Sequence, residues 1–361
     1  MTRVALAHDY FSQWGGAERV TEVLHDMWPE APIYTLFAES RYARRLRGWD
    51  IRTSWLQSLA LSGGWHRLLL PLLPRAVESL RIEPVDVLVS SSSAFIKGVA
   101  VPEGTRHVCY CHSPTRYLWD WSANYLQEEV PALLRAPVRS LLDPLRSWDR
   151  AAADRVDRFV ANSDAVRARI RRYYERDAEV VHPPIDVGSY QLQPEREDFY
   201  LIVSRLIAYK HVDVAIRAFN ELGTRLKIVG EGRDRRRLER IARDNVEFLG
   251  RQPDAQLREL LAASRGLVFP AEDDFGIVCV ESLASGRPVL ALDRGGAPEI
   301  VEDARTGVLF ENPTPEAVVD AVRRAESIAF DPEHLRRSAQ RFDTSLFQAR
   351  MRSIVNDEAG R

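Results

Sequence analysis

The chain has 361 residues, which at about 150 residues per domain allows two domains with separate cores. Its 45% hydrophobic and 28% charged residues exclude a disordered, collagen-like or membrane-spanning chain. Fifty Lys and Arg against 52 Asp and Glu give a net charge of −2, which argues against nucleic-acid binding. Three cysteines are too few for a disulfide scaffold, and no secretory signal is recognisable at the N-terminus. We therefore expect a cytoplasmic protein.

Short β-branched runs alternate with helix-length amphipathic segments throughout the chain, a pattern typical of parallel βαβ units. In the first half we expect a helix at 17–28 and strands at 3–7, 85–90, 106–110 and 158–161. All eight tryptophans fall in the first 150 residues, so the two halves differ in character. A double proline at 183–184 favours extended backbone and marks a linker.

The second half repeats the plan, with helices expected near 210–221, 233–243, 254–263 and 277–285. Its strands are expected at 199–203, 226–229, 266–269 and 288–291. We predict an α/β protein of two Rossmann-like domains facing each other across a cleft. The domains are expected at 1–182 and 183–343, with a C-terminal helix at about 344–361 that packs back on the first.

Sites in open α/β sheets lie beyond the carboxyl ends of the strands, so the turn after the first strand is a candidate. Gly15 and Gly16 open a helix there, where backbone can approach a ligand closely and N–H groups can bind an anion. A tight turn without a ligand is the alternative. The spacing does not match the dinucleotide fingerprint G-x-G-x-x-G.

His112 follows another expected strand, beside a turn held by Pro114. At the end of a strand the imidazole can face a cleft, where it could form hydrogen bonds with a substrate or exchange protons with it. The alternative is a structural histidine whose ring is hydrogen-bonded to the backbone. Cys109 and Cys111 share one face of the strand. They lack a second cysteine pair, so we interpret them as core residues and not as zinc ligands.

Two cations follow the strand at 199–203. Arg205 and Lys210, with Ser204, stand at the start of the next helix, where long side chains and the helix dipole can converge on a diphosphate. Solvated surface cations are the alternative. Gly230 closes the following strand and leaves room for a flat base or a ribose.

An acidic loop leads into the apolar helix expected at 277–285. Asp273 lies at its entrance and Glu281 eight residues on, about 12 Å away at 1.5 Å per residue and comparable to the span from sugar to ribose in a nucleotide sugar. Amides of Phe275, Gly276 and Ile277 would point at the phosphates between them. The alternative is an acidic N-cap and an unrelated glutamate, although a carboxylate within an apolar helix needs a partner.

Taken together, these motifs resemble the retaining glycosyltransferases of family 4, which have the GT-B fold of two Rossmann-like domains. The resemblance covers nearly the whole chain, through motifs at 15–18, 112–114, 162–163, 204–210, 230–232 and 273–281. Asp273 stands where the family has a glutamate. The stretches 110–120, 274–277 and 295–299 look most like mannosyltransferases that build bacterial O-antigen and exopolysaccharide.

The resemblance implies retaining transfer of a hexose from a nucleoside diphosphate sugar, without metal or other cofactor, to a glycan or lipid-linked glycan. GDP-mannose is the expected donor. The implied catalytic residues are His112, Arg205, Lys210 and Asp273. The implied donor-binding residues are Gly15, Gly16, Ser204, Gly230, Asp274, Phe275, Gly276, Ile277 and Glu281. Among these, Glu281 would bind the ribose, Asp273 the sugar, and Arg205 with Lys210 the diphosphate.

Three other functions remain open at this stage: a glycosyltransferase using a UDP-sugar, a nucleotide-sugar 2-epimerase, and a non-catalytic sugar-nucleotide-binding protein. The segment 41–81 bears on the acceptor. It carries eight arginines against two acids, with tryptophans and leucines between them. This composition suits an interfacial helix resting on anionic lipid at the inner face of the plasma membrane, and a core helix with a solvated face is the alternative.

Overall fold

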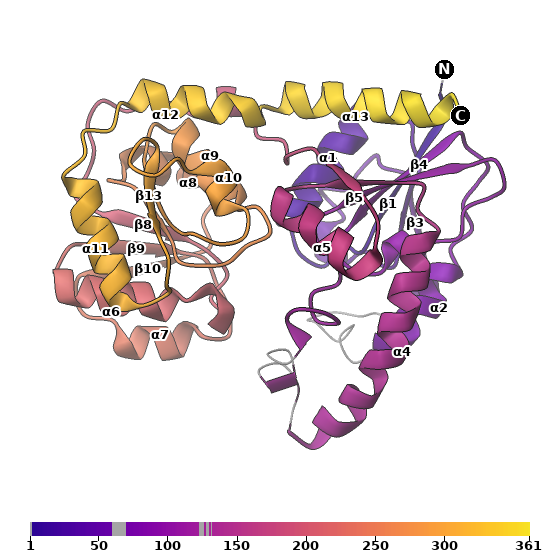
Figure 1. Ribbon diagram of the computed structural model, residues 1–361, viewed down its shortest axis with the longest axis horizontal. Helices are drawn as coiled ribbons and strands as arrows, with labels where there is room; N and C mark the ends of the chain where they lie inside the picture. The colour runs from indigo at the N-terminus through magenta and orange to yellow at the C-terminus, as the bar shows by residue number, and fades with distance from the viewer. Residues whose placement is uncertain (1, 60–69, 123–125, 128–129, 131) are drawn as a thin grey trace. The chain divides into compact units, whose positions relative to one another are not determined.

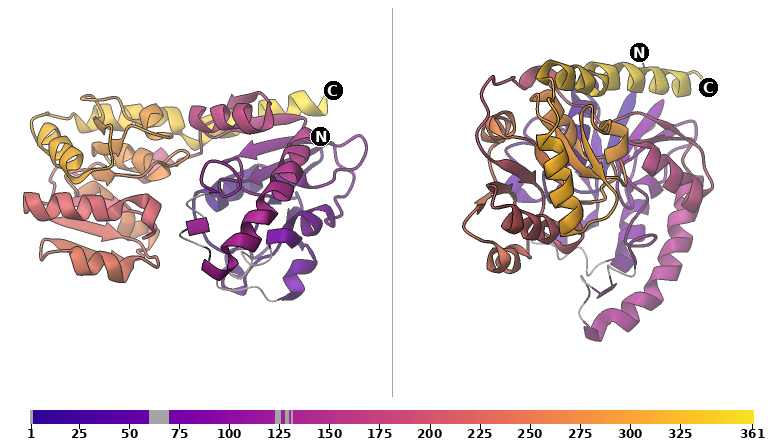
Figure 2. Two further views of the ribbon diagram at one scale, coloured as in Figure 1. Left: turned by 60° about the horizontal axis from the view of Figure 1, so that its bottom comes forward. Right: turned by 60° about the vertical axis from the view of Figure 1, so that its left-hand side comes forward.

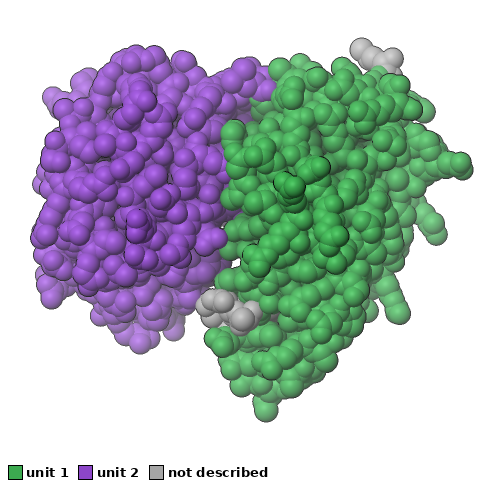
Figure 3. All heavy atoms as spheres, in the orientation of Figure 1, with its two compact units in different colours: residues 1–182, 347–361 green, residues 183–346 purple. Residues whose placement is uncertain are grey.

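The computed structural model describes residues 2–59, 70–122, 126–127, 130 and 132–361. The chain divides into two compact units, coloured separately in Figure 3. Unit 1 comprises residues 1–182 and 347–361, and unit 2 comprises residues 183–346. Because the chain leaves unit 1 and later returns to it, unit 1 is discontinuous in sequence.

Unit 1 is built on a sheet whose seven described strands lie in the order β3-β2-β1-β4-β5-β6-β7. Figure 1 labels four of them, β1, β3, β4 and β5. Every pairing is parallel. The strands are β1 (Val4–His8), β2 (Ile33–Thr35), β3 (Ile51–Thr53), β4 (Val87–Ser92), β5 (Arg106–Cys111), β6 (Arg158–Ala161) and β7 (Ala178–Val180). The strand order changes direction between β1 and β4, and ligands of open α/β sheets bind at such a switch point.

Helices cover both faces of this sheet. They are α1 (Gly16–Met27), α2 (Leu73–Glu78), α4 (Arg135–Asp154), α5 (Asp164–Tyr174) and α13 (Thr344–Ala359). Phe347 and Met351 of α13 share a core cluster with Leu6 and Val89 of the sheet. Val4 at the start of β1 belongs to the same cluster as Ile354 and Val355 of α13. Helix α13 is the yellow helix that ends at the C mark in both views of Figure 2.

Unit 2 has a parallel sheet whose six described strands lie in the order β10-β9-β8-β11-β12-β13. They are β8 (Tyr200–Val203), β9 (Leu226–Val229), β10 (Val246–Gly250), β11 (Leu267–Phe269), β12 (Val289–Leu292) and β13 (Gly307–Phe310). The helices are α6 (Val212–Leu222), α7 (Arg235–Ile241), α8 (Asp254–Ala263), α9 (Ile277–Ala284), α10 (Ala297–Ile300), α11 (Pro315–Glu326) and α12 (Pro332–Ala339). Here the switch point lies between β8 and β11.

Alternation along β12 shows why this sheet is buried on both faces. Val289 and Ala291 pack into one core cluster, whereas Leu290 and Leu292 pack into another on the opposite face. Successive strand residues point to opposite faces, so a continuous apolar run serves two layers of helices.

The α/β fold of two Rossmann-like units is confirmed. Each expected helix and strand is present, with ends that differ by at most two residues from the expected ones. Cys109 and Cys111 are fully buried, which confirms their assignment to the core. Among the described residues, no helix is both long and apolar enough to cross a bilayer.

Candidate active site

The polar residues at the switch point of unit 2 are brought together by two loops. Lys210 ends the short 3-10 helix Ala208–Lys210 after β8, and its ammonium forms an ion pair with Asp273 in the loop after β11. The Lys210 side chain is 10% exposed and that of Asp273 is 22% exposed. Lys210 is therefore not a freely solvated cation, which excludes the alternative for this residue.

Arg205 differs from Lys210. Its side chain is exposed, and its guanidinium donates a hydrogen bond of 2.6 Å to the hydroxyl of Tyr209. Both cations precede α6, which begins at residue 212. Ser204 donates its hydroxyl hydrogen to the carbonyl of Arg205 at 3.1 Å.

The acidic loop, residues 270–276, is held by close packing against Gly295 and Gly296. A Cβ on Gly295 would lie 2.1 Å from the carbonyl oxygen of Asp273, and one on Gly296 would lie 2.4 Å from the Cα of Phe275. The amide of Gly296 donates to the carbonyl of Asp273 at 2.9 Å. Only glycines permit such contacts, so this pair fixes the backbone that carries Asp273.

The end of the acidic loop is anchored by Phe275, which is 3% exposed and packs edge-on against Phe342. Asp274 and Ile277 on either side are partly buried. Gly276 has a φ of 96° and is the N-cap of α9. The alternative of an acidic N-cap is therefore wrong, because a glycine in the left-handed region occupies that position.

Glu281 lies in the buried middle of α9 and is 4% exposed. Its Oε1 accepts a hydrogen bond of 2.8 Å from the hydroxyl of Tyr190. The expectation that this carboxylate needs a partner is confirmed. Tyr190, which no sequence motif marks, supplies one such contact.

Gly230 has a structural reason to be glycine. Its φ is 136°, and a Cβ there would lie 1.9 Å from the carbonyl oxygen of Ser204. A Cβ on the next glycine, Gly232, would lie 2.1 Å from the carbonyl oxygen of Leu206. Both glycines thus allow this turn to pack on the loop that carries Arg205 and Lys210.

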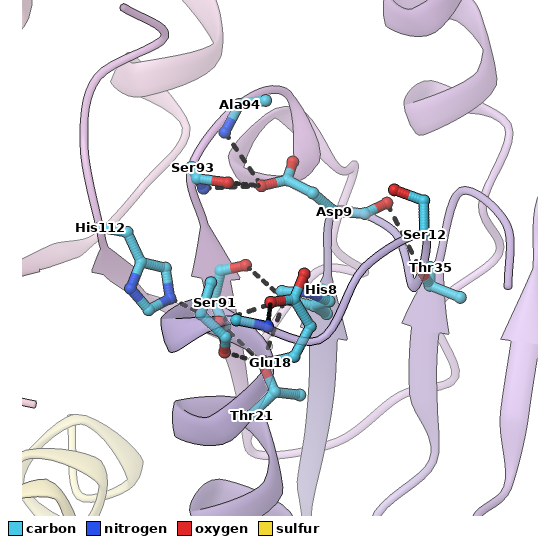
Figure 4. Close-up of polar contacts among 12 residues, drawn as sticks. His8, Asp9, Ser12, Glu18, Thr21, Thr35, Ser91, Ser93, Ala94 and His112 are labelled. Atoms are coloured by element: carbon cyan, nitrogen blue, oxygen red, sulfur yellow. Dashed lines mark hydrogen bonds and ion pairs between the residues drawn. The ribbon is translucent and has the colours of Figure 1, made fainter. Parts of the chain in front are cut away.

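At the switch point of unit 1, buried polar side chains form a connected network (Figure 4). Gly15 is the N-cap of α1 and Gly16 its first residue; the Gly15 amide donates to Oε2 of Glu18 at 2.8 Å. The other carboxylate oxygen lies 3.8 Å from Nε2 of His8. Glu18 and His8 are 2% and 1% exposed, so the glycine turn rests on a buried acid and a buried imidazole.

Asp9, the next residue, holds the loop after β4. Its carboxylate accepts backbone N–H bonds from Ser93 at 2.6 Å and Ala94 at 2.9 Å (Figure 4), and a third from Ile96 at 2.8 Å. Asp9 is 1% exposed. Its place directly after a buried strand was the one signal in the sequence that could have marked it.

His112 directly follows β5 and is 8% exposed. Its amide donates to the carbonyl of Ser92 at 2.7 Å, and its Nε2 lies 2.8 Å from Oγ of Ser91. The imidazole is therefore hydrogen-bonded to a side-chain hydroxyl. The alternative had placed a backbone group in this role. Burial, with a smaller contribution from the charge of His8, lowers the pKa of His112 to about 3, so the ring is neutral at pH 7.

The loop after His112 is fixed by a buried ion pair. Lys97 and Asp149 lie 2.5 Å apart and are 1% and 0% exposed. The same carboxylate accepts hydrogen bonds from Thr115, Trp119 and Tyr174. Lys97 also donates to the carbonyl of Ala94, so the loops that follow β4 and β5 are joined through one charged pair.

The segment 41–81 does not form one interfacial helix in its described part. Before residue 60 it consists of short turns of 3-10 helix and the edge strand β3. Residues 60–69 lie outside the described residues. The following helix α2 buries Leu73, Ala76 and Val77, which fits the alternative of a core helix.

Some arginines of this segment have local partners. Arg41 binds Glu39 and the carbonyl of Ser12, and Arg45 lies over the ring of Trp14 at 4.4 Å. Arg44 and Arg47 are exposed. In the 3-10 helix Trp55–Leu59, the two end residues are 42% and 48% exposed.

Two family models match the chain: Glycosyltransferase Family 4 over residues 14–189, and Glycosyl transferases group 1 over residues 190–342. Their boundary falls close to the passage from unit 1 to unit 2. The chain belongs to the family 4 glycosyltransferases with the GT-B fold.

Curated relatives include a GDP-mannose-dependent alpha-mannosyltransferase of Mycobacterium tuberculosis. It is 28% identical over 324 residues, which cover 86% of this chain and 75% of that protein. A D-inositol 3-phosphate glycosyltransferase of Segniliparus rotundus is 31% identical over 190 residues, which cover 44% of this chain and 42% of that protein. The chain therefore matches less than half the length of this second relative.

Solved structures share the fold over the whole chain. Anabaena HepE in complex with UDP and glucose has a TM-score of 0.70 and 18% identity, and the match covers 99% of this chain and 100% of that chain. Sucrose-phosphate synthase from Thermosynechococcus elongatus has a TM-score of 0.75 and 16% identity, with 99% of each chain covered. At these identities the likeness establishes the architecture alone.

Proposed function

We propose that the protein is a retaining mannosyltransferase that moves mannose from GDP-mannose to a lipid-linked glycan. The observation that carries this proposal is the ion pair of Lys210 and Asp273, which stands with Arg205 at the switch point of unit 2. A relative named for GDP-mannose and matched over 86% of the chain supports the choice of donor.

The chemistry of the pair suits this donor. In the transfer, the bond between the sugar C1 and the diphosphate oxygen breaks, a bond from C1 to the acceptor oxygen forms, and the leaving diphosphate gains negative charge. Lys210 and Arg205 can stabilise that charge, and Asp273 can accept hydrogen bonds from sugar hydroxyls. In a front-face displacement, the leaving phosphate oxygen takes the acceptor proton. Glu281, held by Tyr190, would bind the ribose hydroxyls.

The two cations lead us to propose that transfer needs no divalent metal, because they supply the positive charge that a metal would give the diphosphate. Activity should persist in EDTA. Loss of activity in EDTA that magnesium or manganese restores would contradict this part of the proposal.

A panel of GDP-, UDP- and dTDP-sugars tested by thermal shift would identify the donor. A donor at 100 times its Kd adds about 2.7 kcal/mol to the free energy of unfolding. We expect GDP-mannose to give the largest shift and the α anomer to appear in the product by NMR. The second candidate function is a glycosyltransferase that uses a UDP-sugar, as suggested by the complex of HepE, which has the same fold, with UDP. A larger thermal shift with a UDP-sugar than with GDP-mannose would favour it. Turnover of the nucleotide sugar without an acceptor would indicate an epimerase.

The acceptor side of the proposal is a peripheral contact with anionic lipid. Exposed Arg44 and Arg47 lie in the same arginine-rich segment as Trp55 and Leu59, which expose apolar surface. Each cation near an anionic surface contributes about 1 kcal/mol. Replacing Arg44 and Arg47 with Glu should reduce sedimentation with anionic liposomes, whereas the same change at Arg236 and Arg240 of α7 should not. Wild-type protein that stays in the supernatant at low salt would exclude this contact.

A further inference from the structure

The two ring nitrogens of His112 have different surroundings. Nε2 lies 2.8 Å from Oγ of Ser91, inside the protein. Within the part of the chain that the structure describes, no hydrogen bond is made to Nδ1. The backbone of His112 is also fixed, because its amide donates to Ser92 of the neighbouring strand.

Ser91 is itself held from two sides. Its Oγ is 2.9 Å from Oγ1 of Thr21 in α1 and 3.3 Å from Nδ1 of His8 in β1. Nδ1 of His8 also lies 3.2 Å from the carbonyl oxygen of Ser91 and 3.1 Å from Oγ1 of Thr21. With the Thr21 hydroxyl as donor to Oγ of Ser91, the hydroxyl hydrogen of Ser91 can be directed toward Nε2 of His112.

The network continues to the glycine turn. Nε2 of His8 faces Glu18 at 3.8 Å, and Glu18 accepts the amide of Gly15. Ser91, Thr21 and His8 are each 1% exposed. Buried hydrogen bonds restrict the groups they hold, so the contact with Ser91 favours one orientation of the His112 ring.

We propose that Ser91 is a positioning residue for His112: it holds the ring through Nε2, so that Nδ1 is the atom offered to the sugar ligand, and Thr21 and His8 hold Ser91 in turn. The part that concerns turnover rests on the proposed function. The part that concerns the ring nitrogens does not.

The strand provides a matched control. Ser90, the neighbour of Ser91 on β4, points to the other face and lies 2.7 Å from Nε2 of His107. Ser90→Ala and Ser91→Ala thus remove the same kind of bond from two different buried histidines. Only Ser91→Ala should change His112.

The first measurement is the ¹⁵N resonances of the histidine rings by NMR, without any sugar ligand. Ser91→Ala should move the Nε2 resonance of His112, and Ser90→Ala should leave it unchanged. An unchanged Nε2 resonance in folded Ser91→Ala would overturn the proposal. This outcome does not depend on which sugar the enzyme uses.

The second measurement is steady-state kinetics with the donor found in the thermal-shift panel. Loss of the hydrogen bond that orients the His112 ring should lower kcat about tenfold in Ser91→Ala, with the KM for the donor little changed. Thr21→Val, which replaces the hydroxyl with a methyl group, should act in the same direction, and Thr21→Ser, which keeps the hydroxyl, should have the wild-type rate. If Thr21→Val and Thr21→Ser have equal kcat values and equal His112 resonances, the hydroxyl of Thr21 does not position Ser91 and that part of the proposal is wrong. A preference for a UDP-sugar would overturn the proposed donor while leaving the resonance test intact.

Discussion

The two units differ in how far their Lys–Asp ion pairs are exposed to solvent. In unit 1, Lys97 and Asp149 are 1% and 0% exposed, and their bonds are made to one another and to nearby protein groups. In unit 2, the side chains of Lys210 and Asp273 are 10% and 22% exposed. A buried pair fixes geometry at a desolvation cost, whereas a pair that solvent can reach is able to exchange its partner for a ligand. The pair of unit 1 is thus suited to holding loops, and the pair of unit 2 to exchanging contacts.

The largest effect should come from breaking the buried pair of unit 1. Asp149→Ala leaves the ammonium of Lys97 without its carboxylate, which should lower the free energy of unfolding by about 3–5 kcal/mol. Asp143→Ala on the same helix is the control, since Asp143 is 83% exposed and pairs with Arg146 at 2.8 Å. Asp143→Ala should lower the free energy of unfolding by less than about 1 kcal/mol. If urea denaturation gives Asp149→Ala and Asp143→Ala the same decrease in the free energy of unfolding, the contrast between buried and accessible charge is wrong.

Acid should destabilise unit 1 through its buried histidines. Burial lowers the pKa of His107 to about 4, against an ordinary value of 6.5. Between these values the unfolded chain binds a proton that the folded unit does not, so stability present above pH 6.5 is lost as the pH falls toward 4. The loss from His107 should be about 3 kcal/mol. His107→Gln should flatten the dependence of the unfolding free energy on pH, and a slope equal to that of the wild type would oppose this prediction.

In unit 2 the expected effects fall on donor binding. Glu281→Gln and Lys210→Ala should each weaken binding by about 1.5–3 kcal/mol, because each removes a charge-assisted contact. Glu316→Gln, an exposed change of the same kind in α11, is the control. If calorimetry gives both site variants the wild-type affinity for the donor, these two residues do not bind it.

A smaller effect should sharpen the role of Tyr190. Tyr190→Phe removes the hydroxyl that donates to Glu281 and should weaken donor binding by about 1 kcal/mol. In the Glu281→Gln background the same change should add little, because the two residues act through one contact. Additive losses in this cycle would show that Tyr190 acts independently of Glu281.

Much of the fold could be predicted because its strands are apolar runs bounded by turn residues. The strands β2, β3, β7, β10 and β13 were not predicted, and neither were the helices α4, α5, α11 and α12. For β2, β3 and β7 the reason is their length, because three residues show no periodicity of their own. Among site residues, Lys210 and Asp273 stand in local motifs beside strand ends, and the structure brings them into contact.

The supporting residues could not be predicted from local motifs. Ser91 meets His112 only because β4 and β5 pair with Ser92 opposite Cys111. Tyr190 and Glu281 are 91 positions apart in the sequence. Contacts of this kind depend on strand register and helix packing, which a single sequence does not show.

The return of α13 to unit 1 has a consequence for biosynthesis. Phe347, Met351, Ile354 and Val355 complete a core cluster whose other buried members lie between residues 4 and 181. On the ribosome, unit 2 has all its residues available before unit 1 can close that core. A nascent chain stalled before residue 347 should therefore leave the α13-facing side of the first sheet open to chaperones and proteases, even though 182 residues of that unit were made first.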